Sequence, residues 1–280
     1  MTHPEGGDRR VGRIGYGAMR LPGVRGTAED TALACDLLQE AVGLGASVID
    51  TADFYGGGLA NRLIAKALAP YPDRLIISTK VGVKANADGR PAPAATPQEI
   101  RDTVERDLGN LGRSALDLVF LRLPGGPLGD SGVPMERSLE CLAELQSDGI
   151  VRHIGLSSAT AKQIEAASAI VSVDAVQNAL FIGGGQSTEV VQLCTDRKIP
   201  FFAYFPLGMG TLIEKKVDLT PLATTYRAST SQVALAWLLS LSPVVVPIPG
   251  TSNPEHLREN MASERIVLSN DDARRLSDVA

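Results

Sequence analysis

Residues 46–81 read ASVIDTADFYGGGLANRLIAKALAPYPDRLIISTKV, and this stretch decides the fold. Two short runs of apolar and β-branched residues, 46–51 and 74–81, lie on either side of a segment with helical spacing, 57–68. The runs are apolar at consecutive positions instead of alternating, which is typical of strands covered on both faces. The stretch therefore predicts a strand–helix–strand unit of a parallel sheet flanked by helices.

The same unit recurs along the whole chain. Further strands are expected at 14–19, 116–123, 153–158, 174–180, 199–207 and 243–250. Further helices are expected at 29–43, 96–111, 134–148, 161–171, 188–197, 229–241 and 254–261. The helix at 96–111 opens with TPQE, which resembles a capping box with proline at the first helical position. Two loops rich in Gly and Pro, 84–95 and 124–134, follow strands.

Strands and helices that alternate without a long linker predict the α/β class. The spacing fits a single (β/α)₈ TIM barrel that spans 1–280 as one domain, with both Gly/Pro-rich loops at the rim where active sites are built. A doubly wound open sheet is the alternative. The chain lacks the GxGxxG turn after the first strand that a dinucleotide-binding sheet of that kind needs, so the barrel is favoured.

Composition disfavours several classes of function. The net charge is −5 without a run of basic residues, which argues against nucleic acid and acidic membranes as partners. Cys35, Cys141 and Cys194 are scattered without a CxxC pair, so neither a metal site nor a disulfide framework is expected. With no window of about 18 apolar residues and no signal peptide in the first fifteen, we expect a cytoplasmic protein.

Three chemically distinctive residues are expected to meet at one rim. Asp50 ends one predicted strand, Tyr55 lies in the loop after it, and Lys80 ends the next strand. Hydride addition to a carbonyl leaves negative charge on oxygen, so an enzyme must donate a proton there. A tyrosine can donate it when a nearby ammonium lowers its pKa and a carboxylate holds that ammonium in place.

Five motifs in order carry a resemblance to a known family. They are IDTADFYG at 49–56, LIISTKVG at 75–82, VRHIGLSS at 151–158, QVALAWLL at 232–239 and PIPGTSNPEHLREN at 247–260. Together they resemble the aldo-keto reductases over nearly the entire chain. The resemblance implies NADPH-dependent reduction of an aldehyde or ketone, in which Tyr55 is the general acid, Lys80 lowers its pKa and Asp50 pairs with Lys80.

One position departs from that family. FLRLPGG at 120–126 places Arg122 where the family normally has a histidine that orients the carbonyl. A guanidinium brings a permanent positive charge and several donors. Three roles stay open: a hydrogen bond to the substrate oxygen that also depresses the Tyr55 pKa, binding of an anionic substrate group such as phosphate or carboxylate, or a purely structural pair with a carboxylate.

An arginine here resembles a subgroup of bacterial aldo-keto reductases that includes pyridoxal reductases. The subgroup implies pyridoxal as one candidate substrate, with a secondary-metabolite carbonyl as another. The expected partner is thus a small-molecule carbonyl compound, and a monomer is the family expectation. Candidate substrate contacts are Phe54, Leu123, Phe181 and Met209.

The resemblance also implies a cofactor site. Its expected residues are Gly17, Ala18, Met19, Asp50, Ser157, Ser158, Gln177, Tyr204, Phe205, Leu207, Gly208, Gly210, Gly250, Thr251, Ser252, His256, Glu259 and Asn260. Among them Ser157, Ser158 and Gln177 match carboxamide contacts, Tyr204 matches the ring that stacks on the nicotinamide, and Glu259 and Asn260 match adenine contacts. In the run that includes Gly208 and Gly210, glycine would let the backbone approach a pyrophosphate.

The adenosine end leaves the choice of nucleotide open. Gly250 and His256 stand where family members often carry Lys and Arg for the 2′-phosphate of NADPH, so NADH is the alternative cofactor. The 2′-phosphate could instead be bound by Thr251, Ser252, Asn253 and the backbone of Gly250, with Arg258 close in sequence.

Two other functions on the same barrel stay open. One is a nucleotide-binding regulatory subunit, similar to the channel-associated members of the family. The other is a dehydratase or isomerase that uses Tyr55 and Lys80 without net hydride transfer.

Overall fold

The computed structural model describes residues 12–21, 28–125, 128–184, 188–208 and 217–278. Its strands are β1 (Tyr16–Gly17), β2 (Val48–Asp50), β3 (Ile76–Ala85), β4 (Pro91–Ala94), β5 (Leu116–Arg122), β6 (Val151–Ser157), β7 (Ala175–Ala179), β8 (Phe201–Tyr204) and β9 (Val245–Pro247). Its helices are α1 (Ala28–Gly43), α2 (Leu59–Leu68), α3 (Pro97–Leu111), α4 (Met135–Ser147), α5 (Ala161–Ala167), α6 (Thr188–Arg197), α8 (Thr220–Tyr226), α9 (Thr230–Leu241), α10 (Pro254–Ala262) and α11 (Asn270–Ser277). Short 3₁₀ helices follow β1 (η1, Ala18–Arg20) and α10 (η4, Ser263–Arg265).

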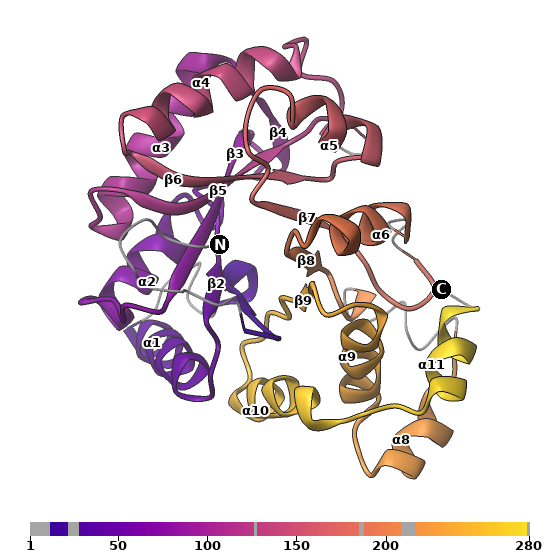
Figure 1. Cartoon of the computed structure of the whole chain (residues 1–280). Helices are drawn as coiled ribbons and strands as arrows, with labels where there is room; N and C mark the ends of the chain where they lie inside the picture. Colours follow the sequence, from indigo (N-terminus) through magenta and orange to yellow (C-terminus); the bar gives the residue numbers. More distant parts are fainter. Residues whose placement is uncertain (1–11, 22–27, 126–127, 185–187, 209–216, 279–280) are drawn as a thin grey trace.

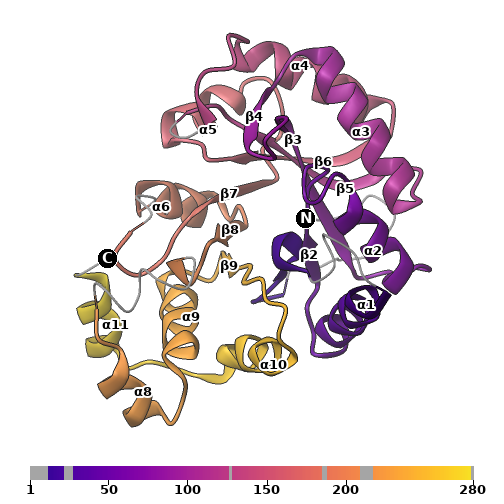
Figure 2. The same cartoon turned by 180° about the vertical axis from the view of Figure 1, so that it is seen from behind.

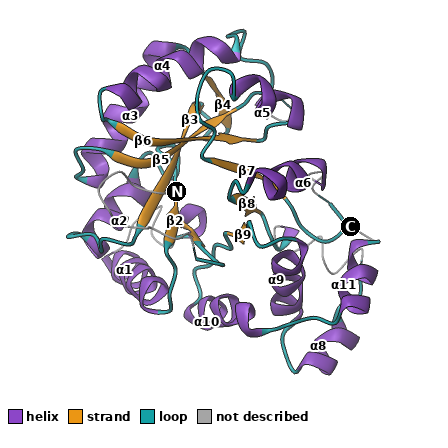
Figure 3. Ribbon diagram, in the orientation of Figure 1, coloured by secondary structure: helices purple, strands orange, loops and turns teal. Residues whose placement is uncertain are grey.

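The sheet is parallel and curled. Within the described residues its strands pair in the order β1-β2-β3-β5-β6-β7-β8-β9, each with its neighbour in the same direction. The helices form a ring outside these strands, from α1 around to α10 (Figure 1), and the view from behind shows the same ring (Figure 2). Colouring by secondary structure separates the inner strands from the outer helices (Figure 3). The predicted α/β class with a (β/α)₈ arrangement is confirmed.

Backbone hydrogen bonds join the first strand segment to the last. The Gly15 amide donates to the Pro247 carbonyl at 2.9 Å, and the Gly17 amide donates to the Pro249 carbonyl at 3.1 Å. A Cβ built on Gly250 would lie 2.5 Å from the Gly17 carbonyl oxygen, closer than real side chains approach. Glycine is therefore required where these two segments meet and close the sheet.

The inside of the barrel is filled below the rim. Its buried cluster consists of Val48, Ile76, Leu118, Phe120, Ala175, Phe202, Val246 and Ile248, one or two from each of several strands. The rings of Phe120 and Phe202 meet edge to face with centroids 5.5 Å apart, and Tyr204 packs against the cluster from above. This apolar floor limits any ligand site to the upper end of the strands.

One predicted loop is wrong. Residues 84–95 form a hairpin, because β3 continues to Ala85 and pairs antiparallel with β4. The Gly and Pro content that suggested a loop is compatible with the hairpin, since Pro91 and Pro93 lie on an edge strand where a missing N–H costs no ladder bond. The Asn86 side chain accepts from the Asp88 and Arg90 amides and forms the turn.

Three smaller expectations also need correction. The strand expected at 14–19 shortens to Tyr16–Gly17 and turns into η1, and α5 ends at Ala167 instead of residue 171. Helices α8 and α11 were not predicted; both pack on the outer side of α9 (Figures 1 and 2). Helix α11 has only Leu276 buried, so it lacks an apolar stripe that would reveal it.

The described helices are also too short or too polar for a lipid bilayer. None of them combines the length and the apolar character that crossing a membrane requires.

Candidate active site

Asp50, Tyr55 and Lys80 come together at the rim, where β2 ends at Asp50 and β3 ends its parallel pairing with β5 at Val81. Lys80 Nζ donates to Asp50 Oδ2 at 2.6 Å and to the Thr51 carbonyl at 2.9 Å. The same amine lies 5.1 Å from the centroid of the Tyr55 ring. Asp50 and Lys80 are 3% and 6% exposed, so this is a nearly dry ion pair beneath a half-buried tyrosine.

The cations near Tyr55 and its burial shift its pKa in opposite directions. Burial raises the pKa of Tyr55, and the nearby cations Lys80 and Arg122 lower it, with the net direction upward from the ordinary value. Lys80 therefore lowers this pKa as expected, but its effect is smaller than that of burial. Burial alone lowers the pKa of Lys80, but Asp50 and Tyr55 outweigh burial, so the Lys80 pKa rises and the amine stays charged.

The second oxygen of Asp50 is also fully engaged. Oδ1 accepts from Ser78 Oγ at 2.9 Å and from Gln177 Nε2 at 2.7 Å. Gln177 is completely buried, and its Oε1 has no hydrogen-bond partner. An unpartnered buried amide oxygen costs about 1–3 kcal/mol, so it marks a place where a ligand donor would be stabilising.

The serine pair after β6 has a special backbone. Ser158 has φ of +58°, a conformation that costs free energy for a residue with a Cβ, and its amide donates to the Gln177 carbonyl at 2.9 Å. Its hydroxyl forms a hydrogen bond with the Tyr204 hydroxyl at 2.9 Å, whereas the sequence predicted a nicotinamide contact. Ser157 is buried in register with Arg122 and Gln177.

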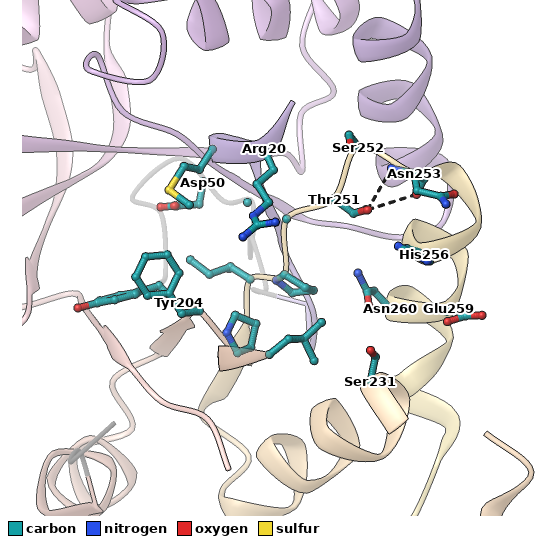
Figure 4. A pocket seen from close by; sticks show the side chains of 18 of the residues that line it. Arg20, Asp50, Tyr204, Ser231, Thr251, Ser252, Asn253, His256, Glu259 and Asn260 are labelled. Carbon is teal, nitrogen blue, oxygen red and sulfur yellow. Dashed lines mark hydrogen bonds between the residues drawn. The ribbon is translucent and has the colours of Figure 1, made fainter. Parts of the chain in front are cut away.

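A cavity of about 610 Å³ extends from this group across the mouth of the barrel. Its lining consists of Gly17, Met19, Arg20, Asp50, Tyr55, Tyr204, Phe205, Pro206, Leu207, Ser229, Ser231, Ile248, Pro249, Gly250, Thr251, Ser252, Asn253, His256, Glu259 and Asn260. Asp50 and Tyr204 lie at one end, the segment from Thr251 to Asn260 lies at the other, and Arg20 projects between them (Figure 4).

Most residues predicted for a cofactor line this cavity, and some do not. Those outside the lining are Ala18, Ser157, Ser158, Gln177 and Gly208. Gly210, and Met209 that was predicted to contact the substrate, lie outside the described residues. Gly208 has φ of +58°, and its amide donates to the Phe205 carbonyl at 2.8 Å. The turn therefore explains this glycine, and its N–H is already satisfied without a phosphate.

The end of the cavity at α10 has few cations. Arg258, which the sequence suggested as a partner for the 2′-phosphate, forms an ion pair with Glu40 at 2.5 Å and does not line the cavity. Arg20 does line it. The sequence analysis missed Arg20, although its place directly after the first strand was a signal that it lies at the rim.

Other polar groups at this end serve the helix itself. The Asn253 side chain accepts from the Glu255 amide at 2.8 Å and caps α10, and Thr251 Oγ1 accepts from the Asn253 amide at 3.0 Å. Ser229 and Ser231, which the sequence analysis also missed, bring the start of α9 to the same end of the cavity. Their position at a helix N-terminus suits an anionic or hydroxyl-bearing group.

The predicted substrate contacts lie at different depths. Phe54 is partly buried and meets the Tyr55 ring edge to face at 4.8 Å. Leu123 is 2% exposed and belongs to the main hydrophobic core, and it does not line the cavity. Phe181 is partly buried and forms an isolated bridge with Gly184.

Arg122 is the last residue of β5 and pairs in register with Ser157. It forms no ion pair with a carboxylate among the described residues. Its guanidinium carbon lies 6.0 Å from the Tyr204 ring centroid, and its Nη1 is buried without a hydrogen bond. The purely structural carboxylate pair considered from the sequence is therefore not what the described residues form. Within the described residues no group of three His, Cys, Asp or Glu is placed to hold a metal ion.

Comparisons with known proteins agree with this geometry. A family model described as the aldo/keto reductase family matches residues 13–280. The chain is 42% identical over 269 residues to pyridoxine 4-dehydrogenase of Escherichia coli K12, which covers 94% of this chain and 93% of that protein.

Solved structures share the architecture. An aldo-keto reductase from Klebsiella pneumoniae in complex with NADPH superposes with a TM-score of 0.81 at 23% identity, over 96% of this chain and 91% of that one. The glycerol dehydrogenase from Gluconobacter oxydans superposes with a TM-score of 0.86 at 20% identity, over 98% and 93% of the two chains.

Proposed function

Because the chain belongs to the aldo/keto reductase family of oxidoreductases, we propose that Tyr55 donates the proton in NADPH-dependent reduction of a small aldehyde to an alcohol. The observation that carries this is the buried Lys80–Asp50 ion pair beneath the Tyr55 ring at one end of a long cavity. The substrate we propose is pyridoxal or a similar aromatic aldehyde, since the relative that is 42% identical is named pyridoxine 4-dehydrogenase.

The residues in and next to the cavity fit a nicotinamide nucleotide. Gln177 is buried next to Asp50 of the lining, its Oε1 lacks a donor, and a primary carboxamide supplies one. The Tyr204 ring lines the same end, with its hydroxyl fixed by Ser158. Arg20 is the side chain that we assign to the phosphates, and Glu259 and Asn260 line the far end for the adenine. When bound, the reduced nucleotide supplies a hydride.

The chain's own residues then have distinct tasks. Tyr55, whose pKa is raised by burial, is fully protonated at neutral pH and therefore holds the proton that reduction consumes. Lys80 and Arg122 place positive charge near the oxygen on which negative charge develops. Asp50 fixes the Lys80 amine, and Ser78 and Gln177 fix Asp50.

The test is NADPH oxidation with pyridoxal, with wild type compared with Tyr55→Phe. We expect the variant to lose about 10²–10⁴-fold in kcat, the usual contribution of a positioned general acid, while it still binds NADPH in a fluorescence titration. Turnover by the variant equal to wild type would contradict the assignment of Tyr55. Nucleotide binding without turnover by wild type would favour the regulatory subunit, and equal affinity for NADH and NADPH would contradict the choice of nucleotide.

A further inference from the structure

Arg122 carries an unused hydrogen-bond donor that the proposed reduction leaves unexplained. Its Nη1 is buried and has no partner, and within the described chain it has no ion pair. Arg113 has a buried Nη1 of the same kind, but its guanidinium is paired with Asp117 at 2.8 Å. Arg122 is therefore the cation at this site whose charge and donor both lack a partner among the described residues.

The surroundings of Arg122 supply no anion to compensate it. The carboxylate of the site, Asp50, is already bound by Lys80, Ser78 and Gln177. On the other side the guanidinium faces the Tyr204 ring at 6.0 Å. A cation held in this way gains most from a negatively charged oxygen of a ligand, because hydrogen bonds between two charged groups are about twice as strong as neutral ones.

The position of Arg122 relative to the proton donor limits where that anion can be. Arg122 directly follows Leu121, which pairs with Val81 of β3. The preceding β3 residue, Lys80, places its amine 5.1 Å from the ring centroid of Tyr55, the residue that we assign to the carbonyl oxygen. An anionic group far from the carbonyl, at the end of a side chain, would not reach both residues. An oxygen on the ring carbon next to the one that carries the carbonyl would.

We propose that Arg122 binds an ionised hydroxyl group ortho to the carbonyl, so that the enzyme selects ortho-hydroxyaryl aldehydes. This inference rests on the proposed function and names its substrate class. A pyridoxal-like aldehyde has this arrangement, since its carbonyl and its acidic ring hydroxyl stand on adjacent carbons. In the reaction the carbonyl carbon accepts the hydride and its oxygen accepts the Tyr55 proton, which gives the alcohol and the oxidised nucleotide; the ortho oxygen is unchanged.

The guanidinium has a second effect on such a substrate. An ionised ortho oxygen donates electron density into the ring and makes the carbonyl carbon a weaker hydride acceptor. A permanent cation on that oxygen withdraws the density again, whereas an imidazole that loses its proton near pH 6.5 would not hold this charge at neutral pH. An arginine in place of histidine is therefore suited to this substrate class.

The experiment compares four aldehydes: 2-hydroxybenzaldehyde, 2-methoxybenzaldehyde, 4-hydroxybenzaldehyde and benzaldehyde. For wild type we expect kcat/KM for the 2-hydroxy compound to exceed that for the 2-methoxy and 4-hydroxy compounds at least tenfold. Arg122→Gln should bring these ratios close to one, and Arg122→Lys, which keeps the charge without the fork, should give intermediate ratios. Arg137→Gln, which removes an exposed cation of α4 outside the cavity, is the control and should leave the ratios unchanged.

A binding measurement makes the inference independent of turnover. Titration of 2-hydroxybenzaldehyde into Tyr55→Phe should produce the absorbance of the bound phenolate at a pH where the free compound is mostly protonated, and Tyr55→Phe combined with Arg122→Gln should not. Three results would each overturn the inference. They are kcat/KM ratios between the aldehydes that are close to one in wild type, kcat/KM ratios that Arg122→Gln leaves unchanged, and a phenolate signal in the variant that lacks Arg122. If neither pyridoxal nor any of the four aldehydes is reduced, the proposed function fails, and the titration still decides the role of Arg122.

Discussion

At the scale of single residues, the proton donor is governed by a contest between burial and charge. Burial raises the pKa of Tyr55, and Lys80 opposes it more strongly than Arg122 does. A phenol with a raised pKa is a weak acid, so its proton is present at neutral pH but leaves reluctantly. The cations make that proton transferable once charge appears on the substrate.

Replacing Lys80 tests this balance. Lys80→Met removes the largest effect that lowers the Tyr55 pKa, so we expect kcat for reduction to fall about 10²–10⁴-fold. In wild type, kcat/KM should stay constant through neutral pH and fall only in the alkaline range, where Tyr55 loses its proton. Stopped-flow measurement of NADPH oxidation between pH 6 and 11 gives both results. A fall centred near pH 7 in wild type would assign the proton to another group.

The buried amide of Gln177 supports a second prediction. Gln177→Leu removes the unpartnered Oε1 together with the bond from Nε2 to Asp50, so we expect NADPH to bind about tenfold more weakly, equivalent to about 1.4 kcal/mol. A nucleotide fragment without the nicotinamide ring, 2′-phospho-ADP-ribose, should bind both proteins equally. Isothermal titration of both ligands measures this difference. Equal loss for both ligands would mean that Gln177 acts through the shape of the barrel and does not meet the nicotinamide.

Residue-level prediction from the sequence succeeded where the residue follows a strand directly. Asp50 ends β2, and Lys80 lies where β3 leaves the parallel sheet, since Val81 is the last β3 residue that pairs with β5. Parallel strands bring these positions to one rim, so their meeting followed from the fold. The partners of Gln177 and the left-handed backbone of Ser158 depend on side chains from other strands. No local pattern specifies such contacts, so the bond between the Ser158 and Tyr204 hydroxyls could not be predicted from the sequence.

At the scale of elements, helix boundaries were predictable where the sequence contains a capping motif. Thr96 and Glu99 form the predicted capping box of α3. Such caps act over four residues and need no tertiary partner. The β3–β4 hairpin and helix α11 have no comparable local signal, and their stability comes from packing against the rest of the molecule.

A buried polar network ties three of these elements together behind the active site. Asp107 of α3 accepts from Asn61 of α2 at 2.5 Å and from Thr79 of β3 at 2.7 Å. Asn61 in turn accepts from Thr51, whose carbonyl receives the Lys80 amine. The network therefore connects the outer helices to the residues that hold Lys80.

This network predicts how stability depends on pH. Burial raises the pKa of Asp107 to about 7, so the folded protein holds this proton more tightly than the unfolded chain does. The resulting stability is complete below about pH 4 and is lost as pH rises through about 7. Between pH 5.5 and pH 8 the free energy of unfolding should fall by about 2 kcal/mol because of this one group.

Urea unfolding of Asp107→Asn measures that contribution. The amide keeps the shape of the side chain and cannot ionise. The free energy of unfolding of the variant, relative to wild type, should therefore be about 2 kcal/mol higher at pH 8 than at pH 5.5. Asp102→Asn, an exposed change on the same helix, is the control and should follow wild type at every pH. If Asp107→Asn runs parallel to wild type over this range, Asp107 is ionised in the folded protein throughout.

At the scale of the whole molecule, the barrel could be predicted from the order of its strands, whereas the way it closes could not. Alternation of apolar runs and helices fixes the number of β/α units and their neighbours. Closure depends on the fit between β1 and the segment after β9, which lie more than 200 residues apart in the chain. The sequence analysis assigned Gly17 and Gly250 to the cofactor, while the structure gives both a second reason to be glycine.

Substitution of Gly250, at the contact between the first strand and the segment after β9, shows which reason dominates. Gly250→Ala would place a Cβ 2.5 Å from the Gly17 carbonyl oxygen, and backbone on both sides leaves little room to adjust. We expect the free energy of unfolding to fall by about 1–3 kcal/mol in the absence of any nucleotide, the usual cost of forcing a methyl into packed surroundings. Gly109→Ala is the matched control, because nothing lies within 4 Å of a Cβ there and the site is helical.

The control should be slightly more stable than wild type, by about 0.5–1 kcal/mol, since alanine favours a helix over glycine. Urea unfolding of the three proteins without ligand separates the two explanations for Gly250. If Gly250 is needed only for the approach of a nucleotide, Gly250→Ala is as stable as wild type without ligand, and only its affinity for NADPH is lower. If Gly250 is needed for closure, Gly250→Ala lowers the stability of the unliganded protein. It then weakens NADPH binding as well, because Gly17 and Gly250, where the first and last strand segments meet, form one wall of the cavity.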